Sequence, residues 1–336
     1  MRRAIHGMTL IELMVSMVLG LIIIGGATGV ILANRQSYRT NEALSQVQEG
    51  ARTAFELMAR DVREAGIMGC DSRGRIANVL NLTAPGSSWW RTWVGIMGYE
   101  GTQATGAVTI GTGTAERVTA TDSIMVQGIQ GAGLAVENHD AANTLIRINS
   151  TTSGLIVNDV LVMCDFDHAA IFQVSNFNAT TRLITHQTGV GTPSNCVRGL
   201  GYPVPAVTCG SAGLPYTFAP NAQLTRLAAT TWYVGNNGRT AEGGRSLYRI
   251  RMGTGATLVT EEIVPGVNDL QLQYREQGRS DFRDANVVTS WANVNAVRVQ
   301  LTMLSTDQRV TTDITVNAGR LRRDFTNIVA LRNRVP

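Results

Sequence analysis

The sequence contains no lysine: all 29 of its basic residues are arginine. A phosphate-binding loop needs a lysine to reach the phosphates, and Schiff-base catalysis needs a lysine amine. Both classes of enzyme are therefore excluded. The formal net charge is +4 at neutral pH, and loss of Arg2 and Arg3 would lower it to +2. This small excess is a weak argument for nucleic-acid binding, and we predict no specific nucleic-acid partner.

Charge and proline are also missing from the amino-terminal region. No charged residue interrupts the 21 positions from Leu13 to Ala33, and no proline lies between Met8 and Gly66. At 1.5 Å per residue, such a run is long enough to cross a bilayer as a helix. One acid, Glu12, stands just inside the apolar region. An ionisable side chain is costly there and is interpreted as functional.

Arg2 and Arg3 precede the apolar run without an acid. Basic residues at this place stay on the cytoplasmic side, so the rest of the chain is predicted to be exported. An ordinary secretory signal has its small-residue cleavage site after the apolar stretch, whereas the small residue Gly7 precedes it here. Cleavage after Gly7 would leave the apolar helix on the mature protein. A plain signal anchor is the alternative, and it explains neither the glycine nor Glu12.

The string Gly7-Met8-Thr9-Leu10-Ile11-Glu12-Leu13 resembles the class III signal of type IV pilins and type II secretion pseudopilins. The resemblance implies that residues 1–7 are a leader, which a prepilin peptidase removes by cutting between Gly7 and Met8. It also implies that the new amino terminus of Met8 is methylated and that Glu12 is needed for assembly. The family usually has Phe where this chain has Met8.

The spacing of Met8 and Glu12 suggests a physical role for the pair. Once Met8 is the terminus, its amine and the Glu12 carboxylate lie one helical turn apart, at i and i+4. Desolvation penalises both charges until they pair. We therefore expect Glu12 of an incoming subunit to neutralise the Met8 amine of a neighbour inside the membrane, which would give assembly a direction and a register.

After Ala33 the pattern becomes that of an amphipathic helix. Its apolar stripe consists of Leu44, Val47, Ala51, Ala54, Met58, Val62 and Ala65. We predict one continuous helix of about 55 residues, membrane or filament core over 8–33 and amphipathic over 34–68, that stops at Gly66 and Gly69. A coiled coil is the alternative, but the short, alanine-rich stripe favours packing on a sheet.

Gly25 and Gly29 form a small-xxx-small pair in the apolar half, a spacing that lets helices approach closely. Glycine also lowers helix propensity, so local unwinding is the alternative interpretation.

Residues 69–336 are predicted to form a mainly antiparallel β domain in the periplasm, which makes the fold class α+β. Alternating or apolar segments between Gly-, Thr- and Asn-rich connections indicate strands at 123–126, 155–162, 170–174, 247–252, 270–274 and 296–303. Five of the eight prolines fall between Pro193 and Pro220. They predict a long irregular loop at 190–222.

Four cysteines in an exported domain imply disulfides, for which three connectivities are possible. We favour Cys196 with Cys209, which closes the proline-rich loop, and Cys70 with Cys164, which ties the end of the helix to a strand. The spacing does not suit a zinc site, because the chain has no CxxC motif.

Asp165, Asp167 and His168 have the types and spacing of metal ligands, but a turn after a strand uses the same residues, and we favour the turn. His139, His168 and His186 are potential bases. No GxSxG or HExxH motif accompanies them, so solvated loop positions are the simpler interpretation. We therefore predict no metal, no cofactor and no enzymatic activity.

Trp89, Trp90 and Trp93 form a tight aromatic group after the helix. They would serve either as an exposed contact for a partner or as part of the core, and the core is favoured in a domain with few aromatic residues.

Several segments of the body resemble the PilW family of minor pilins. They are the helix string 55–66 with Gly69-Cys70, Cys164 with 169–174, Val264-Pro265-Gly266-Val267-Asn268-Asp269-Leu270 before Tyr274, and the ending 322–334. The resemblance covers roughly half of the chain, whereas the stretch from about Trp89 to Asn143 and the proline-rich loop have no counterpart.

The resemblance implies a non-enzymatic component of the type IV pilus. Such a protein joins other minor pilins in a complex that primes polymerisation of the major pilin from the inner-membrane assembly platform. It is expected to lie at the filament tip with an adhesin-like partner and to support twitching motility, adhesion or DNA uptake. Its location would be the inner membrane, as a single-pass protein, and then the pilus tip at the cell surface.

Two other functions fit parts of the sequence. A J-type pseudopilin of type II secretion is related in its helix, but the long body and the arginine-rich tail favour the pilus protein. A membrane-anchored periplasmic enzyme or binding protein would use the helix only as a tether, and its activity would survive Glu12→Ala.

Overall fold

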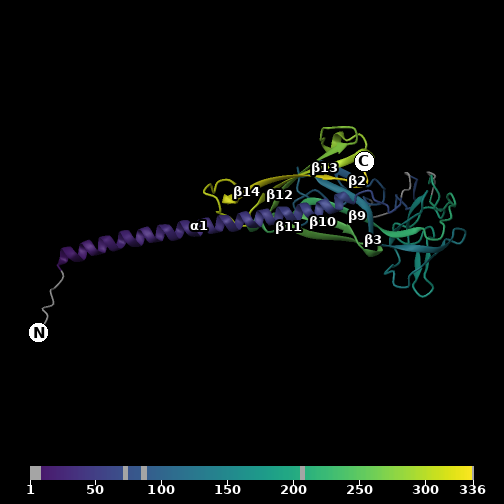
Figure 1. Ribbon diagram of the computed structural model, residues 1–336, viewed down its shortest axis with the longest axis horizontal. Coiled ribbons are helices and arrows are strands. Elements are labelled where there is room, and N and C mark those ends of the chain that lie inside the picture. The colour runs from purple at the N-terminus through teal and green to yellow at the C-terminus, as the bar shows by residue number, and fades with distance from the viewer. Residues whose placement is uncertain (1–8, 71–74, 85–88, 205–208, 335–336) are drawn as a thin grey trace.

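The computed structural model describes residues 9–70, 75–84, 89–204 and 209–334. One long helix, α1 (Leu10–Arg63), extends well beyond the body, and its amino-terminal half stands clear of it. The carboxy-terminal half lies along strands of the body, and a lobe of shorter strands is at the opposite end from the bare helix (Figure 1). The architecture is α+β, as the sequence predicts.

Both ends of α1 follow from local sequence. Thr9 caps the amino terminus, where its side-chain oxygen accepts a hydrogen bond from the Glu12 amide. At the other end Glu64 is the C-cap, and Gly66 follows with φ +78°, a left-handed conformation that favours glycine. The Gly66 amide donates to the Gln127 carbonyl at 2.6 Å. The helix therefore ends where the sequence predicts a stop.

The stripe on the second half of α1 packs on sheets and not on another helix. Its buried residues are Ala43, Val47, Ala51, Ala54, Met58, Ala59 and Val62. Leu44, which we predicted for the stripe, is only half-buried, and its neighbour Ala43 is buried instead. The stripe joins a core cluster with residues of the β strands, so the sheet packing that we favoured over a coiled coil is correct.

A large sheet of 11 strands forms most of the body. Its strands are β1 (Ile76–Asn78), β2 (Ile96–Tyr99), β3 (Ser123–Asp140), β4 (Leu145–Ile148), β5 (Val160–Cys164), β6 (Ala169–Gln173), β7 (Asn176–Asn178), β8 (Leu183–Thr185), β9 (Gln223–Asn236), β10 (Arg245–Met252) and β11 (Leu258–Pro265). The path runs β1-β6-β5-β9-β3-β4-β8-β7, with β10 paired to β9 and β11, and β2 paired to β3. All of these pairs are antiparallel except β1 with β6.

Strands β3 and β9 connect two parts of the molecule. Near α1 they pair with β2 and β10, and at their far ends they pair with β4 and β5. We call β1, β4 to β8, the ends of β3 and β9 that pair with β4 and β5, and the described residues of the segment 186–222 the distal lobe. It has a separate core, in which the largest buried aromatic side chains are Phe172 and Phe218.

A second sheet of three antiparallel strands lies against α1: β12 (Val267–Glu276), β13 (Val294–Leu304) and β14 (Arg322–Ala330). We call this sheet, with β10, β11 and residues 36–63 of α1, the proximal part. Five single-turn 3₁₀ helices lie at Thr240–Glu242, Thr254–Ala256, Ala285–Val287, Trp291–Asn293 and Asn317–Gly319. The main strand contacts of α1 are with β11, β13 and β14.

One predicted strand is displaced. We expected a strand over 155–162, but β5 begins only at Val160. Asn158 has φ +70°, and the Asp159 carboxylate accepts a hydrogen bond from the Ile156 amide at 3.0 Å, so these residues form a turn. The apolar side chains of 155–157 suggested a strand, whereas the Asn-Asp pair marks the turn.

Candidate functional site

The candidate site begins at the amino terminus of α1, where Thr9 and Glu12 form a capping box. The Glu12 amide donates to Thr9 Oγ1 at 3.3 Å, and the Thr9 amide donates to Glu12 Oε2 at 3.4 Å. Glu12 therefore has a local partner as well as the intersubunit partner that we predict. The sequence analysis missed Thr9, although the pattern Thr-x-x-Glu was its signal. Gly7 and Met8 lie outside the described residues.

The apolar half of α1 makes no packed contact with the body. Its large side chains from Leu10 to Leu32 are all more than two-fifths exposed; Ile11 is 74% exposed and Ile23 is 69% exposed. By length and composition α1 is the one described helix that is apolar enough to cross a membrane. Exposed apolar surface of this extent must be covered by lipid or by other helices.

Gly25 and Gly29 lie in the same bare segment. A Cβ atom built on either would meet no atom within 4 Å, and the same holds for Gly20 and Gly26. The body therefore does not require these glycines. Their role in close helix packing stays a prediction. Because no other part of the subunit covers these glycines, their surface is accessible to a neighbouring helix.

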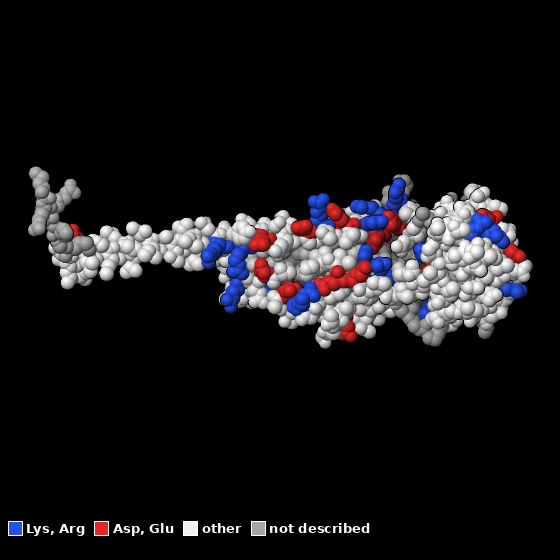
Figure 2. Space-filling model, turned by 90° about the horizontal axis from the view of Figure 1, so that it is seen from below, with Lys and Arg blue, Asp and Glu red and all other residues white. Residues whose placement is uncertain are grey.

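Charged side chains return where α1 meets the body. Figure 2 shows basic side chains at this junction and a mixed row of acidic and basic side chains along the body beside the helix. On α1, Arg52 Nε lies 2.8 Å from Glu56 Oε1. On β10 and β11, Arg249 and Arg251 both pair with Glu261. The exposed face of the proximal part is therefore charge-balanced, which suits polar contacts with neighbouring subunits.

A buried polar contact fixes the end of α1 on the large sheet. The indole Nε1–H of Trp232 in β9 donates to Asp61 Oδ2 at 2.8 Å, and Trp232 is fully buried. Burial raises the pKa of the Asp61 carboxyl, while the Trp232 hydrogen bond opposes that rise. The Arg249 guanidinium lies over the Trp232 ring, 5.4 Å from its centroid. The helix is thus held by a directional contact in addition to its apolar stripe.

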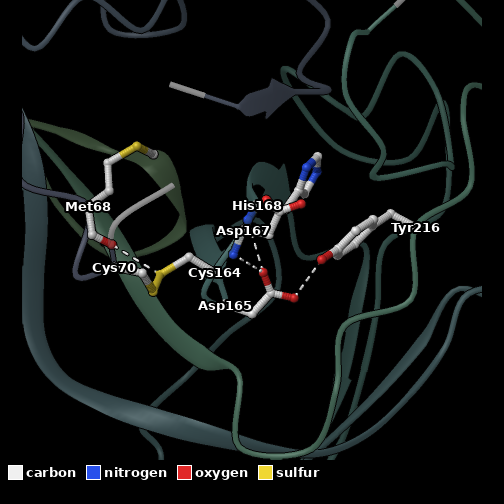
Figure 3. Close-up of a disulfide and its surroundings, with 7 residues drawn as sticks. All are labelled: Met68, Cys70, Cys164, Asp165, Asp167, His168 and Tyr216. Carbon is white, nitrogen blue, oxygen red and sulfur yellow. Dashed lines mark hydrogen bonds between the residues drawn. A yellow bond between two sulfur atoms is a disulfide. The ribbon is translucent and has the colours of Figure 1, made fainter. Parts of the chain in front are cut away.

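Two disulfides are present, with the pairing that we favoured. Cys70 is bonded to Cys164 at the start of the distal lobe, and Cys196 is bonded to Cys209 within the proline-rich loop. Cys164 Sγ also lies 3.4 Å from the Met68 carbonyl oxygen (Figure 3). The first bond ties the segment after α1 to β5, and the second closes a short loop.

The residues that we considered as metal ligands form a turn. Asp165 Oδ1 accepts hydrogen bonds from the amides of Asp167 and His168, at 3.0 and 2.9 Å. Its other oxygen, Oδ2, accepts from the Tyr216 hydroxyl at 2.8 Å (Figure 3). Asp167 pairs with Arg75 at 2.6 Å. In the described part of the chain no three His, Cys, Asp or Glu side chains come together in a way that suits a metal ion.

The histidines correct our interpretation. We expected solvated loop positions, but His139, His168 and His186 are 3%, 3% and 1% exposed. The Phe218 amide donates to His139 Nδ1 at 3.1 Å, so the neutral ring carries its proton on Nε2. That nitrogen lies 3.3 Å from His186 Nε2 and donates to it. Because both Nε2 atoms take part in this hydrogen bond, neither has a free lone pair for a metal.

The tryptophans lie in the core, as we favoured. Trp89 and Trp90 are 7% and 3% exposed, and Trp93 is half-buried beside them. They line the region between the end of α1 and the distal lobe, so an exposed aromatic contact for a partner is not formed here.

Comparison with known proteins gave two family matches. Residues 231–333 match the family described as Type IV Pilus-assembly protein W, and residues 2–28 match the prokaryotic N-terminal methylation motif. The first match begins near the end of β9 and includes the whole three-stranded sheet; the second includes Glu12 and the Gly25 region. Neither the curated proteins nor the solved structures gave a match.

Proposed function

We propose that this chain, which is a pilin of the PilW type, primes assembly of the type IV pilus as part of a tip complex. The family matches support the role of a membrane-associated minor pilin that works with other pilus components. Pilin domains are structural, so the chain acts by assembling and not by catalysis. The subunits, the place in the filament and the sequence of events are parts of our proposal.

The observation that carries the proposal is the bare half of α1. It leaves a long apolar surface uncovered, with Glu12 as the one acid among residues 9–33. A helix that served only as a tether would need neither the acid nor the glycines at its surface. In the proposal, a prepilin peptidase cuts after Gly7, Met8 becomes the methylated terminus, and Glu12 orients the subunit against the Met8 amine of a neighbour.

The body completes the proposed role. It lies in the periplasm while α1 stores the subunit in the inner membrane, and it presents a charge-balanced face beside the helix to other minor pilins and the major pilin. The distal lobe, at the end farthest from the membrane, is the part that faces an adhesin-like partner at the tip. Twitching motility, adhesion and DNA uptake would then depend on this chain through the pilus.

The experiment is complementation of a clean deletion with wild type, Glu12→Ala or Glu49→Ala. Surface pili and twitching are measured, and mass spectrometry of the amino terminus reports cleavage. We expect Glu12→Ala to be cleaved normally and to leave pili near the level of the deletion strain, because an unpaired Met8 amine remains in the membrane. Glu49→Ala, an exposed acid on the body half of the same helix, should restore pili.

Two results would contradict the proposal. Full piliation with Glu12→Ala would remove the assembly role of the carboxylate. Normal pili in the deletion strain, together with a defect in protein secretion, would instead support the J-type pseudopilin.

A further inference from the structure

The connection between β13 and β14 lies beside α1 where the apolar half ends. We call residues 305–321 the neck loop. It projects from the end of the body that faces the bare helix (Figure 1). This position suggests a function that goes beyond assembly through Glu12.

Three side chains of α1 attach the neck loop. Gln36 Nε2 donates to the Val310 carbonyl at 2.7 Å, and Thr40 Oγ1 donates to the same oxygen at 3.2 Å. Arg39 Nη2 donates to the Gln308 carbonyl at 3.1 Å. Val310 itself is 2% exposed and packs in a small cluster with Ala43. The loop is therefore fixed to one level of the helix.

The base of the loop is also well ordered by internal contacts. The buried Arg320 guanidinium donates to the Ser305 carbonyl at 2.9 Å, and the Val310 amide donates to the Gly319 carbonyl at 2.8 Å. Gly319 has φ +71°, and a Cβ atom there would come within 3.0 Å of Arg309 Cα. Residues 312–318, the tip of the loop, remain exposed.

The exposed tip carries apolar side chains. Ile314 is 59% exposed and Val316 is 58% exposed, and on the helix nearby Tyr38 is 69% exposed. Single exposed apolar residues are common on protein surfaces and would mean little elsewhere. Here the position of these side chains along the helix axis matters, because it sets their depth relative to the membrane.

Helix geometry defines that level. The 21 uncharged residues from Leu13 to Ala33 span about 31 Å, which matches the hydrocarbon core of a bilayer. The attachment residues 36–40 follow three to seven positions later, roughly 5–10 Å further along the axis. This is the depth of the headgroups, and the tip of the loop projects from there toward the bare helix.

We propose that the neck loop is a membrane-contact element whose tip, with Ile314 and Val316, enters the boundary between headgroups and acyl chains. The lipid belongs to the same bilayer that α1 crosses, so the contact continues an interface that the helix already makes. Tyr38 suits this boundary because its ring is apolar and its hydroxyl is polar.

Charge supports the contact only weakly. Arg35, Arg39 and Arg309 face the headgroup level, whereas Asp307 and Asp313 oppose them, which leaves an excess of one positive charge. The exposed Asp313 carboxylate has a partner within the tip, because Oδ1 accepts from the Thr315 amide and hydroxyl at 2.9 and 2.6 Å. Apolar insertion is therefore the main interaction. A second contact beside the helix would hold the body at a fixed height and tilt before the subunit enters a filament.

The cysteine content makes a direct test possible. All four cysteines are in disulfides, so Ile314→Cys introduces one reactive thiol into the full chain. An environment-sensitive fluorophore is attached there, and the protein is reconstituted alone in vesicles of phosphatidylethanolamine and phosphatidylglycerol. Lipids brominated near the top of the acyl chain should quench about half of the emission, as expected for a probe at roughly 5–10 Å depth.

The matched control is Val190→Cys, a residue of the distal lobe that is 40% exposed. Its emission should not change with brominated lipid. A third protein carries the probe at Thr312→Cys together with Ile314→Ser and Val316→Ser, and its quenching should fall to the level of the Val190 control. Unaltered thermal unfolding of this variant would exclude a folding defect.

Two outcomes would overturn the inference. Emission from residue 314 that does not respond to brominated lipid would show that the tip stays in water. A change in the emission of the probe at residue 314 that appears only after the major pilin or another minor pilin is added would show that the tip contacts a protein. Neither outcome depends on piliation, so the role of Glu12 in assembly is tested separately.

Discussion

The proximal part and the distal lobe are built on different principles. In the proximal part, the apolar stripe of α1 and the inner faces of β12 to β14 form one core. Its side chains come from segments that are far apart in the sequence. The distal lobe has a core of its own, a disulfide that joins it to the segment after α1, a second disulfide within its proline-rich loop, and a buried group of histidines. Both family matches, at residues 2–28 and 231–333, lie outside the distal lobe.

This difference separates the segments that match family models from a region that neither match covers. The matched segments contain the first part of α1, the three-stranded sheet and the neck loop. The distal lobe is farthest from the bare helix (Figure 1).

Removal of the disulfides should produce the largest effects, and these should differ between the two bonds. Cys70 and Cys164 are 94 positions apart, whereas Cys196 and Cys209 are 13 apart. A closed loop of about 100 residues restricts the unfolded chain by about 4.7 kcal/mol, and one of about 15 residues by about 3 kcal/mol. We expect the double serine variant of the first pair to lose more stability in urea unfolding than that of the second pair.

Hydrogen exchange locates these losses. In both variants the distal lobe should exchange faster, while β13 and the body half of α1 should keep their protection. Equal losses for the two bonds, or a melting temperature that reductant leaves unchanged, would contradict the prediction.

Met58→Ala should destabilise the molecule in the opposite region from the disulfide variants. The Met58 side chain is 1% exposed and lies in the stripe of α1 against the sheets, and its truncation leaves a cavity that costs about 2–5 kcal/mol. Faster hydrogen exchange should appear in the proximal part and not in the distal lobe. Met14→Ala is the matched control, because Met14 is 59% exposed on the bare half of the same helix. Destabilisation of the body by Met14→Ala would show that the two halves of α1 are coupled.

The sequence predicts the helix well because its signals are local. The apolar run, the three- and four-residue spacing of the stripe and the glycines after Glu64 each act over one or two turns. The same reasoning was wrong for the strand at 155–162, where the turn at Asn158 and Asp159 divides an apolar segment. It also could not predict that β12 to β14 form a separate sheet, because strand pairing depends on contacts between distant segments.

The candidate site was predictable only in part. Glu12 stands out because no other charged residue lies between Thr9 and Ala33, and Gly25 and Gly29 stand out by their small-xxx-small spacing. Thr9 was missed although its capping pattern is local. The neck loop has no distinguishing sequence pattern. Ile314 and Val316 gain their significance from the hydrogen bonds that Gln36 and Thr40 make to Val310, across 274 and 270 positions of the chain. The burial of His139 likewise depends on the segment that brings Phe218 onto it.

The smallest predicted effect per residue is on the pH dependence of stability, which should have opposite signs in the two regions. In the distal lobe, burial lowers the pKa of His139 to about 4 and that of His186 to about 3. Below pH 6.5 the unfolded chain binds protons that the folded lobe does not. The contribution of the neutral histidines to the free energy of unfolding is therefore complete above pH 6.5. It decreases as the pH falls, by about 2 kcal/mol for each histidine between pH 7 and pH 5.

Asp122, which directly precedes β3 and accepts a hydrogen bond from β12, gives the proximal part the opposite slope. Burial raises the pKa of its carboxyl to about 7, although Oδ2 accepts a hydrogen bond from the Leu272 amide of β12. Between pH 4 and pH 7 the folded state retains a proton that the unfolded state has lost, so stability falls by about 2 kcal/mol as the pH rises from 5 to 7. Native-state hydrogen exchange at the two pH values, corrected for intrinsic rates, measures both regions in one sample. Asp122→Asn should remove the slope from β12 and leave that of β8 unchanged. His186→Asn should reduce the slope of β8 by about half, because His139 remains, and leave that of β12 unchanged. If acid destabilised both regions together, the distal lobe and the proximal part would be one cooperative unit, and the distinction drawn between them would not extend to their energetics.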